Sequence, residues 1–168
     1  MAFKTAANIF TKKGIKMFST VRYFIKTSIT FLVLGILTGL YMVIARYYFN
    51  TWAPPDLVSA HTHIILVGAV MMMIMGVALW FFPRPEKDDK LYKPNLILAA
   101  YFIITFSTAL RFIFQIVSSF VQLNEIIKFL LLLSSVSQVL GIIIFFVSIW
   151  GRIRSVGSHI REAKGEKF

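Results

Sequence analysis

The chain of 168 residues contains no cysteine and only three histidines. Without cysteine it cannot form disulfides, hold an iron–sulfur cluster through thiolates or attach a c-type haem covalently. Histidine, methionine and the carboxylates are then the side chains left to bind a metal. The sequence also lacks a Ser-His-Asp set, a paired carboxylate site, a glycine-rich phosphate loop and zinc-binding spacing. The usual hydrolytic, nucleotide-binding and zinc-binding sites are therefore excluded.

Hydrophobic residues, in contrast, make up 58% of the chain, which includes 17 phenylalanines and has a mean hydropathy of +0.77. This composition is typical of an integral membrane protein. A helix needs about 20 apolar residues to cross the hydrocarbon core of a bilayer, and only helices and closed barrels satisfy their backbone groups there. Four runs are long and continuous enough to be such helices, at residues 27–48, 58–82, 96–117 and 126–150. The predicted fold is all-α, an integral membrane four-helix bundle.

The ends of these runs carry helix start and stop signals. Pro54 and Pro55 follow the first run, Pro83 follows the second, and Pro94 precedes the third. Asn124 precedes the fourth run and can cap the free amides of its first turn. These signals predict four separate spans with short connections.

Basic residues predict the orientation of the spans. Fifteen of the eighteen lysines and arginines fall in the N-terminal segment, the second loop and the C-terminal tail. Because short basic segments stay in the cytoplasm, both termini are expected to be cytoplasmic, in what we expect to be a prokaryotic cytoplasmic membrane. Residues 1–26 then form a cytoplasmic amphipathic surface helix or a disordered tail, residues 27–150 the transmembrane domain, and residues 151–168 a basic cytoplasmic tail. The net charge of +11 follows from this topology and attraction to lipid headgroups, and does not indicate nucleic-acid binding.

Two histidines, His61 and His63, open the second span in the stretch "SAHTHIILVGAVMMMIMGVALWFF". With the predicted orientation they lie near the outer membrane face, where a histidine within a span usually marks a functional site. Two residues apart on a helix means about 200° of rotation, so the two rings cannot bind the same ion together. The alternative is that each imidazole only hydrogen-bonds to a backbone carbonyl or a headgroup.

The stretch "TFLVLGILTGLYMVIARYYFNTWAPPDLVSAHTHIILVGAVMMMIMGVALWFFPRP" resembles the first two membrane helices of the catalytic subunit of haem-copper oxidases and nitric-oxide reductases. The resemblance covers roughly residues 27–85, about a third of the chain. It implies that His61 is an axial ligand of a low-spin haem b and that His63 occupies the position of a family asparagine. The chain departs from the family because it has no histidine between His63 and His159. It cannot build a binuclear oxygen- or nitric-oxide-reducing centre, so we expect no turnover by the isolated chain.

From this resemblance we expect a noncovalent haem b protein that transfers electrons or binds a diatomic gas. His61, with or without His63, would hold the iron. A homodimer could supply the second axial ligand by presenting the same histidine twice. Alternatively, each protomer holds its own haem through His61 alone, with the sixth position open. A redox partner or a quinol is the expected electron donor.

Other residues could complete such a cofactor site. Arg46 and Arg111 could pair with haem propionates, and Gln115 lies on the same helical face as Arg111. Gly68 could let a flat macrocycle approach the second span. The alternatives are that Arg111 snorkels to the headgroups and that Gly68 only permits a helix contact.

A different function comes from Met71 and Met75, whose four-residue spacing suits a thioether pair that passes monovalent copper. His61 and His63 would then be entry ligands of a copper-binding or copper-transport protein. Methionine is also a flexible core filler, so packing is the simpler explanation of these residues. A noncatalytic accessory subunit of an oxidase is a third possibility.

Overall fold

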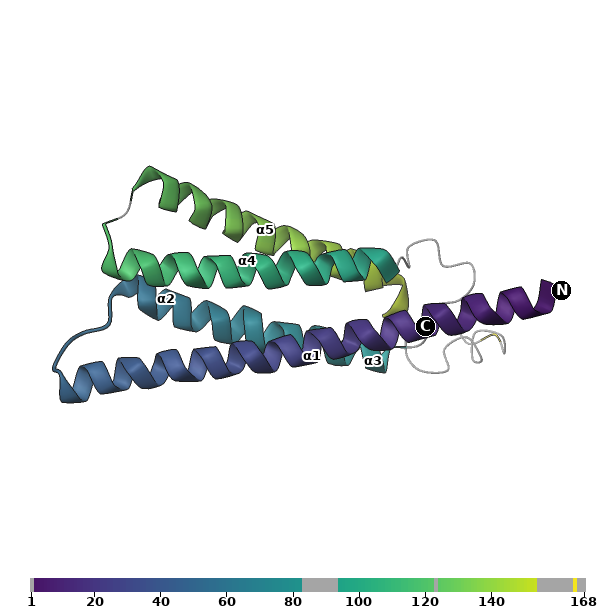
Figure 1. Cartoon of the computed structure of the whole chain (residues 1–168), viewed down its shortest axis with the longest axis horizontal. Coiled ribbons are helices and arrows are strands. Elements are labelled where there is room, and N and C mark those ends of the chain that lie inside the picture. The colour runs from purple at the N-terminus through teal and green to yellow at the C-terminus, as the bar shows by residue number, and fades with distance from the viewer. Residues whose placement is uncertain (1, 83–93, 123, 154–164, 166–168) are drawn as a thin grey trace.

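The computed structural model describes residues 2–82, 94–122, 124–153 and 165, and every regular element within these residues is helical. The elements are α1 (Ala2–Tyr48), α2 (Pro55–His63), η1 (Ile64–Met71), α3 (Met72–Phe81), α4 (Pro94–Phe120), α5 (Glu125–Ile149) and η2 (Trp150–Arg152). They provide four stretches long and apolar enough to cross a membrane, namely Ser19–Tyr48, Pro55–Phe81, Pro94–Phe120 and Glu125–Arg152 (Figure 1). The prediction of an all-α protein with four membrane-spanning helices is confirmed.

The first span is the C-terminal part of a longer helix. α1 runs from Ala2 to Tyr48 without a break, so residues 2–26 belong to the same helix as the first span. The first proline of the chain is Pro54, so no helix breaker of that kind separates the two parts. α1 ends where Asn50 adopts a left-handed conformation (φ 49°) and the amide of Thr51 donates to the carbonyl of Ala45 at 3.0 Å.

The second span consists of three consecutive helical segments. α2 begins with Pro55, a residue suited to the first position of a helix because it needs no amide partner there. A π-helical segment, η1, follows directly after His63 and is succeeded by α3. Phe82 then turns to an extended conformation, as the residue before a proline prefers. A π-helical segment widens the turn and occurs often beside functional sites.

α4 and α5 form an antiparallel hairpin. The side chain of Asn124 accepts a hydrogen bond from the amide of Ile127 at 2.9 Å, which confirms the predicted cap. In Figure 1, α5 separates from α4 toward the end of the bundle where the short connections lie. We call this end, with residues 49–54, 121, 122 and 124, the hairpin end, and the opposite one the terminal end.

The terminal end holds a well-packed core. The buried ring of Phe24 on α1 makes edge contacts with Tyr101 of α4 and Phe145 of α5, at centroid distances of 5.2 and 5.5 Å. The hydroxyl groups of Thr27 and Tyr101 are 2.8 Å apart. Gly141 of α5 lets the helix approach Ile104 of α4, because a Cβ there would lie 2.7 Å from its side chain. Three of the four spans are thereby fixed to one another at this end.

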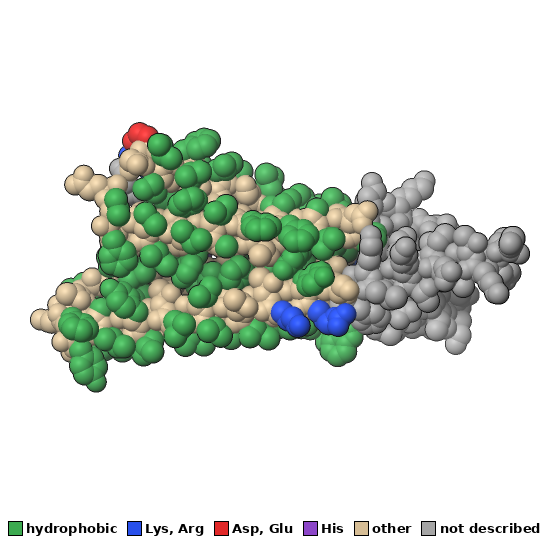
Figure 2. Space-filling view, viewed as in Figure 1, with side chains coloured by type: hydrophobic (Ala, Val, Ile, Leu, Met, Phe, Trp, Pro, Cys, Tyr) green, Lys and Arg blue, Asp and Glu red, His purple; other side chains and the backbone are tan. Residues whose placement is uncertain are grey.

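Large apolar side chains cover the outside of the helices (Figure 2). An outward-facing apolar surface of this extent, on four helices of spanning length, is that of an integral membrane protein. The second loop and most of the C-terminal tail, whose charges underlie the predicted orientation, lie outside the described residues. Arg152, which the sequence had placed in that tail, is instead buried against α3.

Candidate functional site

His61 is half-buried in the interface between α2 and α1. Its Nδ1 lies 2.9 Å from the backbone carbonyl oxygen of Gly35 on α1. Since a carbonyl can only accept a hydrogen bond, Nδ1 carries the hydrogen, and Nε2 of the neutral ring keeps its lone pair. The ring also lies against Gly39, where a Cβ would come within 2.8 Å of His61 Cε1. The chain therefore needs glycine at position 39 to accommodate this imidazole.

His63 faces a different neighbour. Its Nδ1 is 2.8 Å from the carbonyl oxygen of Ser59 in the preceding turn of α2 and 3.3 Å from the Ser59 hydroxyl oxygen. By the same argument Nδ1 carries the hydrogen and Nε2 has the free lone pair. Ser59 in turn contacts α4, so His61 and His63 lie on opposite sides of α2. The two rings do not form a common metal site.

α2 and α4 are joined by a line of polar residues, which we call the polar seam. Ser118 donates to Asp56 Oδ2 at 2.8 Å, and the Gln115 amide donates to the Ser59 hydroxyl at 2.8 Å. Gln115 is only 7% exposed, so its pairing within the apolar bundle matters for stability. Asp56 also lies in the first turn of α2, where a carboxylate interacts favourably with the helix dipole.

Arg111 faces the last helix of the bundle. Its Nη1 donates to Gln138 Oε1 of α5 at 3.2 Å, and Gln138 Nε2 donates to the Thr108 hydroxyl of α4 at 2.7 Å. Gln115, four residues further along α4, bonds to α2 instead. The structure therefore does not bring Arg111 to the side of α2 on which His61 lies, and gives this arginine a partner within the bundle.

Arg46 and Gly68, the other residues predicted to contact a cofactor, lie on α1 and η1. The Arg46 guanidinium is 3.6 Å from the centre of the Trp52 ring and donates weakly to Asn50 at 3.4 Å. It lies seven residues beyond Gly39, which places it on the same face of α1 two turns toward the hairpin end. The space in front of Gly68 is occupied by Phe31, since a Cβ there would lie 2.8 Å from the ring. Gly68 serves a contact between helices.

The methionines of the second span pack in the core. Met72 and Met75 are almost completely buried, at 0% and 1% exposure. Met73 accepts a long hydrogen bond from the Ser28 hydroxyl at 3.7 Å to its sulfur. Met71 packs on the edge of the same core cluster. These positions are those of core-filling side chains.

Sequence reasoning missed Arg152. Its side chain is 2% exposed, and its Nη2 donates to the carbonyls of Leu79 and Phe82 at 3.3 and 3.0 Å. It therefore caps the end of α3 with a positive charge, which a helix C-terminus favours. Ser59 and Ser118 of the polar seam were missed too, although the spacing of Asp56, Ser59 and His63 marks one helix face.

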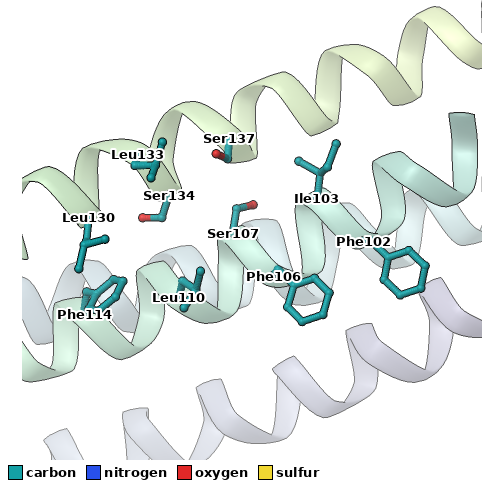
Figure 3. Close-up of a pocket in the computed structure, with 10 residues that line it drawn as sticks. All are labelled: Phe102, Ile103, Phe106, Ser107, Leu110, Phe114, Leu130, Leu133, Ser134 and Ser137. Carbon is teal, nitrogen blue, oxygen red and sulfur yellow. The ribbon is translucent and has the colours of Figure 1, made fainter.

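A groove of about 460 Å³ opens between α4 and α5 (Figure 3). Phenylalanines 102, 106 and 114 line it from α4, and the hydroxyl groups of Ser107, Ser134 and Ser137 lie along it. Ser107 and Ser134 donate to carbonyls within their own helices, which leaves the groove largely apolar. Its walls are suited to contact with lipid chains.

Comparisons of the chain with family models, with curated proteins and with solved structures find no match. Among the described residues no three histidine, cysteine or acidic side chains come together in a way that could hold a metal ion. The imidazole of His61 is the group whose surroundings most resemble those of a metal-binding histidine.

Proposed function

We propose that this chain is an integral membrane protein that binds haem b noncovalently through His61, with both termini in the cytoplasm. Its first two spans would correspond to the first two helices of the haem-copper oxidase catalytic subunit. The protein would act in electron transfer or in binding a diatomic gas. When bound, the haem would supply the one-electron and gas-binding chemistry that protein side chains lack.

The observation that supports this proposal is the hydrogen bond between His61 and Gly35. Histidines that bind a metal nearly always donate their other ring N–H to a carbonyl or carboxylate, which fixes the tautomer and makes the free nitrogen more basic. The 2.9 Å contact to Gly35 does this for His61 and leaves Nε2 available. Neutral imidazole nitrogen is a ligand that suits haem iron.

Two further residues fit a cofactor on this side of the bundle. Gly39 places no side chain beside the imidazole, so the ring stays against α1. Arg46 lies on the same face of α1 toward the hairpin end, which in the proposed orientation is the outer face. Its guanidinium could pair with a propionate through two parallel hydrogen bonds.

Within the part of the chain that the structure describes, one protomer supplies a single histidine to this side, since His63 faces the polar seam. We propose that a homodimer provides the second axial ligand around a two-fold axis, or that the sixth position stays open to a gas. A membrane quinol or a redox protein would serve as the electron donor.

The test is the absorption spectrum of the purified chain, expressed with ample haem precursor, together with a pyridine haemochrome assay. The wild type is expected to show a Soret band and a haemochrome of the b type. His61→Ala is expected to lose that band, because no other imidazole among the described residues faces α1 at this level. A colourless wild type, or a copper-loaded one, contradicts the proposal.

His63→Gln is the matched control, since it removes the neighbouring imidazole on the opposite side of α2. We expect it to keep the haem content of the wild type. Loss of the Soret band in His63→Gln with retention in His61→Ala would instead assign the iron to His63.

A further inference from the structure

The polar seam between α2 and α4 follows a regular register. Asp56 is paired with Ser118, and Ser59, three residues later on α2, is paired with Gln115, three residues earlier on α4. Two antiparallel helices that pack in this way continue their contact with a step of four residues on each. That step runs from Ser59 to His63 on α2 and from Gln115 to Arg111 on α4. Continuation of this register would place His63 and Arg111 level with each other at the next position of the seam.

Three polar atoms of the residues around this position have no hydrogen-bond partner among the described residues. Arg111 Nε and Gln115 Oε1 are enclosed and have no hydrogen-bond partner within the part of the chain that the structure describes. Arg111 Nη1 is already bonded to Gln138, and Gln115 Nε2 is already bonded to Ser59. The third atom is His63 Nε2, whose lone pair is free because Nδ1 donates to the Ser59 carbonyl. The position thus presents one donor and two acceptors.

We propose that this position is a binding site for a single water molecule. Water can accept one hydrogen bond from Arg111 Nε–H while it donates one to Gln115 Oε1 and one to His63 Nε2. A metal cation is disfavoured by the adjacent guanidinium, and an anion would face the lone pairs of the amide and the imidazole. A small neutral molecule with two donors and one acceptor satisfies all three atoms.

The bound water would connect the helices across the hairpin half of the bundle. The chain of hydrogen bonds would run from Ser59 of α2 through Gln115, the water and Arg111 to Gln138 of α5. α5 packs mainly on α4 and diverges from it toward the hairpin end, so this chain of hydrogen bonds would connect α5 to the second span as well (Figure 1). This role is independent of the proposed haem, because His61 faces α1.

The direct test is a crystal structure of the full chain grown in a lipid mesophase at a resolution that shows ordered water. Density within hydrogen-bond distance of Arg111 Nε, Gln115 Oε1 and His63 Nε2 is expected. Direct contact between His63 and Arg111, an anion at the site, or side chains that point apart with no density between them would overturn the proposal.

A double-mutant cycle on the melting temperature of the full chain tests it in solution. Arg111→Met and His63→Leu each remove one hydrogen-bonding group of the site and leave the remaining polar atoms without their bound water. Each is therefore expected to lower the Tm by roughly 5 °C. The double variant should melt only slightly below the less stable single variant, because the two residues share one bound molecule. Arg111→Met combined with His61→Leu is the control, for which the two shifts are expected to add. Additive shifts for the His63 pair would overturn the proposal as well.

Discussion

At the scale of the residue, a single hydrogen bond determines which nitrogen of His61 is free. The carbonyl of Gly35 accepts from Nδ1, and Gly39 leaves room for the ring beside α1. Glycine is required at position 39 because of this close approach and not because of backbone conformation. Two residues of α1 therefore determine that Nε2 is the nitrogen with the free lone pair.

Gly39→Ala is expected to weaken haem binding by roughly 10-fold, the lower end of the range for a disturbed metal-ligand partner. The new Cβ would lie 2.8 Å from His61 Cε1, so the ring must move and its bond to Gly35 is strained. Haem titration of the apoprotein measures the effect.

Gly76→Ala is the matched control for this substitution. Its Cβ would come within 3.0 Å of Phe24 and Ile25, so it should destabilise the protein by a comparable clash at the terminal end. Its haem affinity should stay at the wild-type value. Equal haem affinities in the two variants would show that the packing of His61 against Gly39 does not matter for the ligand.

At the scale of the element, Arg152 ties the end of the last span to the end of α3. Its Nη2 reaches two carbonyls that α3 leaves without intrahelical partners, Leu79 and Phe82. The contact is buried, so water cannot replace the arginine. It joins the second and fourth spans where both end.

Arg152→Met is expected to lower the free energy of unfolding by about 1 to 3 kcal/mol, because it leaves buried carbonyls unpaired. For a chain of this size that corresponds to a fall in Tm of about 2 to 4 °C per kcal/mol. Arg22→Met, at an exposed position on α1, removes the same charge and should change stability by no more than about 0.5 kcal/mol. A similar Tm for the two variants would contradict the capping role.

The spans themselves could be predicted from sequence because their ends carry strong local signals. Pro55, Pro94 and Asn124 begin helices in the structure close to where the sequence places them. The burial of Arg152 could not be predicted, because its partners are backbone carbonyls about 70 residues away, which carry no side-chain signal. The π-helical turn after His63 likewise depends on packing against α1 and α4.

The candidate site was predictable only in part. The two histidines stand out in an apolar span, and their separation around the helix already indicates different neighbours. The sequence alone does not predict which helix each imidazole contacts, because this depends on how α1 and α4 pack around α2. For the same reason the sequence does not indicate that Arg111 bonds to Gln138 of α5.

At the scale of the whole molecule, the positive-inside pattern predicts that the hairpin end faces outward. The chain has no cysteine, so a single introduced cysteine reports its own side without interference. Thr51→Cys and Gln122→Cys are expected to react with a membrane-impermeant maleimide added to intact cells. Lys87→Cys, in the basic second loop, should react only after the cells are opened. The reverse pattern would invert the proposed topology and place His61 near the cytoplasm.

Because α5 diverges from α4, the arrangement of these two helices is expected to respond to the surrounding bilayer. The two helices are in close contact near Gly141 and Ile104 and open into the groove toward the hairpin end. Acyl chains that enter this groove would press on the part of α5 that lies beyond its close contact at Gly141. We therefore expect the thickness and chain packing of the surrounding leaflet to set the angle between these helices.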